Sequence, residues 1–434
     1  MAKNNDSVNT NILKNSLSAF IMIIIGLIAG YGFIYIIAHN YGARGTGIYS
    51  LATASLFVLG MMANFGFNNA SLKYIGKFQS ENKLYKIKDL YKIFFQISIP
   101  ISIIISILLY TFSNALSEII FKDADLAASL KIISLVVPFY VLFLINVELI
   151  RGFNNIKLSE FLRRSIIPII NIILILTLGH KDINLPVVIY DISLSIAFLI
   201  SSFYLFAKFK NFTQSEKISE SRRQIIKSSS AMMITGLAFF FMTYTDTFML
   251  GIFTSTDSIG IYNVAIKLAA TTSFILIALN TVVAPKFSHL FWAKKQTELE
   301  NIVNFSAKII FWFSLPVVLL LIIMSGFLMN LFGPEFTVGR NVVIILALSQ
   351  FLNAICGTAG SFMKMTGSET AFRNIVILAM ALNIILNLFL IPLYGINGAA
   401  IASFISMALW NIASVIMIKQ KNNINAFYFP FITR

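Results

Sequence analysis

Residues 309–329 read IIFWFSLPVVLLLIIMSGFLM and carry no charged side chain. A helix rises about 1.5 Å per residue, so a stretch of roughly 20 apolar residues crosses about 30 Å of hydrocarbon. The same character extends along the whole chain of 434 residues, of which 58% are hydrophobic and 12% charged. Soluble proteins carry roughly 25% charged residues. The deficit leaves too little polar surface to cover a water-soluble globule, so the sequence predicts an all-α membrane protein.

Eleven further apolar segments resemble 309–329, and their length favours helices over buried strands. The predicted spans are 15–38, 47–68, 93–112, 127–147, 165–179, 186–206, 231–252, 259–283, 309–329, 340–361, 374–391 and 398–418. The fifth is short and contains Pro168, so it departs most from the pattern. No small-residue cleavage site follows the first span, which predicts that it is a retained helix and not a signal peptide. The fold expected is therefore polytopic, with about twelve transmembrane helices.

The distribution of lysine and arginine predicts the orientation of these spans. With the N-terminus in the cytoplasm, 27 of the 33 cationic side chains fall in cytoplasmic segments and five in the outer loops and their flanks. This bias agrees with the positive-inside rule and predicts that both termini are cytoplasmic. The net charge of +15 alone would be compatible with nucleic acid, but the cations lie between apolar runs, which argues against a nucleic-acid partner. The single cysteine, Cys356, excludes a disulfide within the chain.

The sequence contains an internal repeat with an offset of 213 residues. Gly47-Ile48-Tyr49-Ser50-Leu51-Ala52 recurs as Gly260-Ile261-Tyr262-Asn263-Val264-Ala265, and Ile12 to Ser16 and Ile183-Asn184 recur at the same offset. The repeat predicts two six-helix halves, 1–213 and 214–434, joined in the basic stretch 208–223. Because six is even, both halves enter the membrane from the same side and are expected to be related by a pseudo-twofold axis along the membrane normal. The alternative is an old duplication that serves folding only.

Three ionisable residues stand out within the predicted spans, where a charge costs at least about 2.5–3.5 kcal/mol on insertion scales. They are Asp191, Asp246 and Lys267. The repeat places apolar residues at the equivalent positions of the other half, which favours a functional origin for these charges. Asp246 and Lys267 lie at similar depth on consecutive spans, so a structural ion pair between them is the alternative, as is snorkelling of Lys267.

Other candidates for substrate contact lie at the ends of spans. His39 and Arg44 lie in the outer turn after the first span, where a solvated loop is the alternative interpretation. Arg151, with Glu148, Arg163 and Arg164, lies at the cytoplasmic ends of the fourth and fifth spans. These residues could receive an anionic headgroup, although cations that set topology explain the arginines equally well.

Hydrolytic and metal-binding motifs are absent from the sequence. There is no HExxH, GxSxG or Walker sequence and no His/Cys cluster, and the outer loops are too short for a catalytic domain. The sequence therefore predicts a transporter and not an enzyme, without a metal or cofactor, driven by an ion gradient or by substrate mass action.

Several motifs together resemble the Wzx-type polysaccharide flippases of the multidrug/oligosaccharidyl-lipid/polysaccharide exporter superfamily. The motifs are Asn40-Tyr41-Gly42-Ala43-Arg44-Gly45-Thr46-Gly47, Asn64-Phe65-Gly66-Phe67, Asp246-Thr247-Phe248-Met249-Leu250-Gly251, Pro285-Lys286-Phe287-Ser288, Leu331-Phe332-Gly333-Pro334-Glu335-Phe336 and Ile391-Pro392-Leu393-Tyr394-Gly395-Ile396-Asn397-Gly398. The resemblance covers nearly the whole chain. Many relatives carry Arg before the outer turn, where this chain has His39.

The resemblance implies a function. Such a protein moves oligosaccharide linked to undecaprenyl pyrophosphate across the bacterial inner membrane, in O-antigen, lipopolysaccharide or other polysaccharide biosynthesis. It implies a cationic cavity for the pyrophosphate, coupling to H+ or Na+, and polymerase and chain-length proteins of the same pathway as partners, besides membrane lipids. Lys267 would then contact the headgroup, and Asp246 would modulate Lys267 or carry a coupling proton. A multidrug/cation antiporter of the same superfamily is the alternative, and a membrane-embedded glycan polymerase is a further one.

Overall fold

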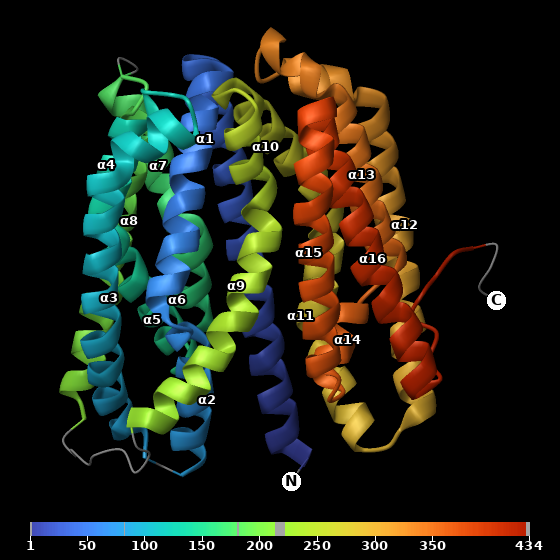
Figure 1. The fold of residues 1–434 in the computed structure, drawn as a ribbon. Coiled ribbons are helices and arrows are strands. Elements are labelled where there is room, and N and C mark those ends of the chain that lie inside the picture. The colour runs from blue at the N-terminus through green and yellow to red at the C-terminus, as the bar shows by residue number, and fades with distance from the viewer. Residues whose placement is uncertain (1, 82, 180–181, 213–221, 431–434) are drawn as a thin grey trace. The chain divides into compact units, whose positions relative to one another are not determined.

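The structure, a computed structural model, describes residues 2–81, 83–179, 182–212 and 222–430, and within these ranges the regular elements are all helices (Figure 1). The first half of the chain contains α1 (Ala2–Asn64), α2 (Phe67–Ser80), η1 (Leu84–Lys86), α3 (Ile87–Ala115), η2 (Leu116–Ile120), α4 (Leu126–Leu135), α5 (Val137–Gly152), α6 (Ile156–Glu160), η3 (Phe161–Ile166), α7 (Ile167–Leu178) and α8 (Leu185–Lys210). The second half contains α9 (Arg222–Phe253), α10 (Thr256–Ala270), η4 (Thr271–Ser273), α11 (Phe274–Trp292), α12 (Gln296–Asn330), η5 (Pro334–Gly339), α13 (Arg340–Ile355), α14 (Ala359–Met365), α15 (Glu369–Tyr394) and α16 (Ile396–Asn422).

The predicted spans lie on these helices. Among the described residues, ten helices are long and apolar enough to cross a membrane, or eleven if α4 and α5, which are bent by 51°, form one span. The first two predicted spans both lie on α1, which counts once in that number. The structure therefore confirms the all-helical, multi-pass membrane fold.

The chain reverses direction inside α1, at Gly42. This residue has φ 66° and ψ −169°, a conformation that glycine adopts without the strain that a Cβ would bring. The rings of Phe33 and Tyr49 lie 5.6 Å apart between centroids. In an uninterrupted helix these two residues, sixteen positions apart, would be separated by about 24 Å. The two parts of α1 therefore run antiparallel, as the blue chain in Figure 1 shows.

The helices form two compact units. Unit 1 holds the residues up to Tyr41 and Ile48–Phe240, and unit 2 holds Gly42–Gly47 and Phe241–Arg434. Helix α9 contributes to both. The sequence boundary predicted at 213/214 falls on 213–221, which lie outside the described residues, and it stays a prediction.

In unit 1, a buried polar network joins three helices. The Asn146 amide on α5 accepts a hydrogen bond from the Tyr91 hydroxyl on α3 at 3.0 Å. It donates to the Ser201 and Ser202 hydroxyls on α8 at 3.1 and 3.0 Å. Hydrogen bonds of this kind replace the missing hydrophobic drive for helix association in lipid. The network therefore fixes the register of α3, α5 and α8.

In unit 2, two glycines separated by the repeat offset allow very close packing. An ideal Cβ on Gly47 would lie 1.9 Å from the Thr256 carbonyl oxygen, and one on Gly260 would lie 2.0 Å from the Ala43 carbonyl oxygen. Ala43 and Thr256 are also 213 positions apart. The contact of Gly47 with Thr256 is therefore equivalent, through the repeat, to the contact of Gly260 with Ala43. Two such reciprocal contacts are the pattern of a local twofold axis. The 43–47 and 256–260 segments meet backbone to backbone, as small residues permit in membrane helices.

Helices α15 and α16 form an antiparallel hairpin in unit 2. Gly395, with φ 55°, reverses the chain between them, and an ideal Cβ on Gly398 would lie 2.1 Å from the Leu390 carbonyl oxygen. Because Asn387 and Ser403 lie at equal distances along the chain from Gly395, this tight hairpin places them beside each other.

Candidate functional site

Asp246 on α9, in unit 2, is an ionisable residue with a buried side chain and several hydrogen-bond partners. Its Oδ2 accepts hydrogen bonds from the Tyr262 hydroxyl on α10, at 2.5 Å, and from the Ser403 hydroxyl on α16. Its Oδ1 accepts hydrogen bonds from the side-chain amides of Asn387 at 2.7 Å and Asn383 at 3.4 Å, both on α15. We call these five residues the Asp246 cluster.

The sequence places the members of the Asp246 cluster on matching faces. Asn383 and Asn387 are four residues apart, so both project from the same side of α15. The Asn387 amide also donates to Asn383 Oδ1 at 3.1 Å. The α15–α16 hairpin then adds Ser403, and the short link between α9 and α10 adds Tyr262. Four helices therefore converge on one carboxylate.

The chemistry of the Asp246 cluster suits a proton or a hard cation. An ionised carboxylate offers about four acceptor positions, and four neutral donors occupy them. The side-chain oxygen of Asn387 is buried and accepts no hydrogen bond. Carboxylate, amide and hydroxyl oxygens are the ligands that hard cations prefer. A carboxylate inside a membrane helix with such partners is a functional hypothesis by default.

Lys267 lies in the last turn of α10, also in unit 2, and is half-buried. It follows Tyr262 by five residues, which places the two about 140° apart around the helix. Tyr262 faces Asp246, so Lys267 leaves α10 from a different face. The ion pair between Asp246 and Lys267 weighed from the sequence stays a prediction, as does a role for Lys267 in substrate contact.

Asp191 lies on α8 in unit 1 and is 8% exposed. Its Oδ1 is buried and has no hydrogen-bond partner. The ring of its neighbour Tyr190 contacts the rings of Tyr49, at 6.1 Å between centroids, and Phe57, at 6.2 Å. Asp191 therefore stands next to an aromatic cluster of unit 1, whereas the Asp246 cluster belongs to unit 2.

His39 and Arg44 flank the reversal at Gly42 and are both exposed. The imidazole of His39 stacks on the Tyr35 ring with 6.0 Å between centroids. The helix that restarts at Ala43 is capped by Glu335, whose Oε1 accepts the Ala43 backbone N–H at 2.7 Å. An acidic group at a helix N-terminus is stabilised by the helix dipole. The cap comes from the sequence motif 331–336, which the sequence alone did not connect with the outer turn.

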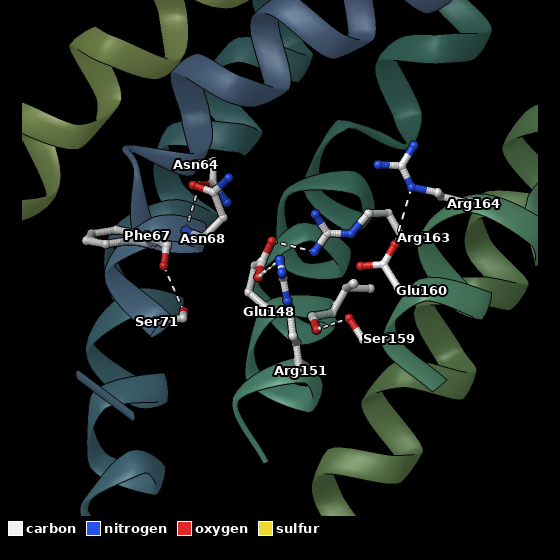
Figure 2. Close-up of polar contacts among 11 residues, drawn as sticks. Asn64, Phe67, Asn68, Ser71, Glu148, Arg151, Ser159, Glu160, Arg163 and Arg164 are labelled. Atoms are coloured by element: carbon white, nitrogen blue, oxygen red, sulfur yellow. Dashed lines mark hydrogen bonds and ion pairs between the residues drawn. The ribbon is translucent and has the colours of Figure 1, made fainter. Parts of the chain in front are cut away.

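Arg151 lies in the last turn of α5 in unit 1, beside Glu148, as Figure 2 shows. Its Nη1 lies 3.9 Å from Glu148 Oε2, and Arg163 on η3 donates a hydrogen bond to Glu148 Oε1. The six candidates from the sequence are thus divided between the two units. Unit 1 holds His39, Arg151 and Asp191, and unit 2 holds Arg44, Asp246 and Lys267. The partners of Asp246 were missed, although two asparagines four residues apart in an apolar span are a signal that points to a polar helix face.

Residues 12–291, well over half of the chain, match the family described as "Polysaccharide biosynthesis protein". Residues 231–389 match the MatE family.

Three relatives illustrate the similarity. The probable low-salt glycan biosynthesis flippase Agl15 of Haloferax volcanii is 25% identical over 191 residues, which are 44% of this chain and 40% of that protein. The probable flippase AglR of the same organism is 29% identical over 176 residues, 40% of this chain and 37% of that protein. The chain thus spans about two fifths of the length of these relatives. A putative O-antigen transporter of Shigella flexneri is 20% identical over 412 residues, 92% of this chain and 96% of that protein.

Two solved structures share the fold. The lipid II flippase MurJ in an inward closed conformation superposes with a TM-score of 0.74 and 18% identity, covering 94% of this chain and 87% of MurJ. The MATE multidrug transporter DinF-BH gives a TM-score of 0.69 and 17% identity, covering 97% of each chain.

Proposed function

Because the chain belongs to the polysaccharide biosynthesis protein family of the multidrug/oligosaccharidyl-lipid/polysaccharide exporter superfamily, we propose that it is a flippase for lipid-linked oligosaccharides. Its substrate is an oligosaccharide repeat unit carried on undecaprenyl pyrophosphate. It moves this unit from the cytoplasmic to the outer leaflet of a bacterial inner membrane, with both of its own termini cytoplasmic. The observation that carries the proposal is the family match over 12–291 in a chain built almost wholly of membrane-spanning helices.

The physical task explains why a protein with these residues is needed. A pyrophosphate and its sugars cannot cross hydrocarbon unaided, and their negative charge calls for Lys or Arg along the pathway. Lys267, the one cation placed deep in a predicted span, is the residue that we propose to contact the headgroup. The prenyl chain stays in lipid while the polar part passes by alternating access.

We further propose that the Asp246 cluster carries the coupling ion, a proton or Na+. Asp246 supplies the charge, and Tyr262, Ser403 and the two asparagines supply neutral oxygens. The unused Asn387 oxygen is the position that a cation would complete. The cluster joins four helices, so occupying or emptying it changes the packing of α9 and α10 against α15 and α16.

The proposal is tested by deleting the gene in its host and measuring surface polysaccharide together with accumulated lipid-linked units. Loss of surface glycan with accumulation of the lipid-linked precursor is expected. In complementation, Lys267→Ala should fail to restore export while reaching wild-type membrane levels, and Lys308→Ala, an exposed lysine of α12, should restore it. Full export with Lys267→Ala would remove Lys267 from the pathway.

A second candidate function is drug/cation antiport, and the MatE match over 231–389 together with the buried Asp246 favours it. It makes the opposite prediction for the deletion strain. Surface glycan would be unchanged and resistance to cationic dyes would fall, and that outcome would overturn the flippase assignment.

A further inference from the structure

Two carboxylates and three guanidinium groups meet in unit 1, where α5 ends and α6 and η3 begin (Figure 2). The carboxylates belong to Glu148 and Glu160. The guanidinium groups belong to Arg151, Arg163 and Arg164, which we call the arginine cluster. The sequence left two interpretations open for Arg151, Arg163 and Arg164, contact with an anionic headgroup or cations that set topology, and the proposed transport function has not used them.

The acidic side chains lie inside and the basic ones outside. The side chains of Glu148 and Glu160 are 7% and 10% exposed, whereas those of Arg151, Arg163 and Arg164 are 45%, 31% and 44% exposed. Topology-setting cations need only be solvated, and they need no buried acid behind them. Here the buried carboxylates hold the guanidinium groups in place and leave their outer edges accessible.

The contacts leave much of the donor capacity of the arginines unused. Arg163 donates to Glu148 Oε1, and Arg164 Nε donates to Glu160 Oε2 at 3.3 Å. Arg151 Nη1 approaches Glu148 only to 3.9 Å, which is an ion pair without a hydrogen bond. Each guanidinium carries five N–H donors, so most of the donors in the arginine cluster remain open to a ligand.

One of these open donors is buried. Arg163 Nε is shielded from solvent and has no hydrogen-bond acceptor. A buried N–H without an acceptor costs free energy, and such a group calls for an explanation, for example an ion or ligand. An acceptor oxygen brought by a ligand would satisfy it.

The backbone under the arginine cluster is held firmly. Arg163 and Arg164 lie on the π-helical turn η3, a feature frequent at functional sites. The next residue, Ser165, donates its hydroxyl to the Met22 carbonyl on α1 at 2.6 Å. An ideal Cβ on Gly26 of α1 would lie 2.3 Å from the Arg164 carbonyl oxygen. This contact with α1 fixes the turn, so the guanidinium groups are preorganised.

We propose that the arginine cluster binds the diphosphate group of a prenyl-linked substrate at the membrane surface. Three guanidinium groups against two carboxylates leave a net positive charge, and the planar fork of each arginine matches phosphate oxygens in pairs. The inference rests on the proposed function for the identity of the substrate. The same chemistry would accept an anionic phospholipid headgroup or free phosphate, and the experiment distinguishes these sources.

The test measures binding and does not depend on transport. Full-length protein in phosphatidylcholine nanodiscs is titrated with farnesyl diphosphate, and the affinity is compared with those for farnesyl monophosphate and inorganic pyrophosphate. Arg151→Gln removes one guanidinium and leaves the Arg163–Glu148 pair intact. The double variant Glu148→Gln/Arg163→Gln removes the Arg163 guanidinium together with its carboxylate partner, so that no buried unpaired charge remains. Arg373→Gln, a partly exposed arginine of unit 2, is the matched control.

We expect each cluster variant to weaken farnesyl diphosphate binding about tenfold or more, with less than about a twofold change for the control. Arg163→Lys, which keeps the charge but loses the fork, should give an intermediate loss. Equal affinity of wild type and cluster variants would overturn the proposal. So would equal binding of free pyrophosphate, or full displacement of the probe in nanodiscs containing phosphatidylglycerol. If the variants lose binding but the deletion strain keeps its surface glycan, the site stands and the flippase function fails.

Discussion

At the residue scale, the environment of Asp246 determines what the side chain can do. Its two oxygens accept hydrogen bonds from Tyr262, Ser403, Asn383 and Asn387, all of which are neutral. A charge held inside a membrane by neutral dipoles can exchange one of these donors for a mobile cation or proton more easily than a charge paired with a fixed arginine can. The arrangement is therefore suited to exchange.

Asp246→Asn should remove the capacity of the Asp246 cluster to bind a proton or a cation. The new amide would direct N–H groups at side chains that now donate, which costs about 1–3 kcal/mol of stability unless the hydroxyls rotate. We expect a lower melting temperature and the loss of any stabilisation by Na+ or by a change of pH. Both are measured by thermal unfolding in detergent. Asp257→Asn, an exposed aspartate at the start of α10, is the control, and identical behaviour of the two variants would contradict the cluster's role.

The sequence made Asp246 a candidate because a carboxylate in an apolar span is costly. It could not supply the partners, since they lie 16 to 157 positions away and become neighbours only through helix packing. The pairing with Lys267 rests on equal depth alone and stays a prediction. Depth follows from the helix rise, but which face a residue presents depends on helix rotation, which packing decides.

At the element scale, the close crossing of 43–47 with 256–260 depends on two glycines. Gly47 and Gly260 let backbone approach backbone at a distance that excludes any Cβ. Neither position needs glycine for its own helix, where alanine is the better helix former. The requirement comes from the neighbouring segment.

Gly47→Ala should therefore destabilise the protein, because its Cβ would overlap the Thr256 carbonyl. We expect a loss of about 1–3 kcal/mol or a failure to accumulate in the membrane. Gly30→Ala in α1 is the matched control, since an ideal Cβ there meets nothing within 4 Å. That variant should be neutral or slightly stabilised, by about 0.5–1 kcal/mol. Comparison of expression levels and melting temperatures checks both, and an equally stable Gly47→Ala would show that the contact is not required.

Hydrophobic runs were enough to find the helices, because lipid forces every span to satisfy its own backbone. The irregularities were not predictable in the same way. The bend between α4 and α5 and the π turn η3 do not alter the apolar pattern. Each stands just before a proline, Pro138 at the start of α5 and Pro168 at the start of α7, which cannot donate a helical backbone hydrogen bond. The contact of η3 with α1 also holds the turn in place. The outer turn after the first span was expected as a loop, and the structure confines its non-helical conformation to Gly42.

At the scale of the whole molecule, the distribution of charge predicts the orientation in the membrane. The cationic side chains concentrate in segments that lie on one side of the predicted topology. The putative O-antigen transporter of Shigella flexneri aligns along 92% of this chain at 20% identity. Orientation decides which ends of the helices meet a substrate made in the cytoplasm.

Reporter fusions test that orientation. Alkaline phosphatase fused after Lys122, between η2 and α4, should be active, and the same enzyme fused after Lys210, at the end of α8, should be inactive. A green fluorescent protein at the C-terminus should fluoresce, because it folds in the cytoplasm. The reverse pattern would place the arginine cluster on the outer side and exclude it as a loading site for a substrate made in the cytoplasm.

The membership of residues 42–47 in unit 2 has a consequence for biosynthesis. Ribosomes add about 5–20 residues per second, so the 256–260 segment emerges roughly 10–40 s after Gly47, and the capping Glu335 later still. We expect the first two spans to insert during that interval, while the turn between them lacks its partner. The nascent chain therefore passes through an intermediate with an unfinished turn, and an insertase or chaperone that shields this turn would raise the yield of correctly assembled protein.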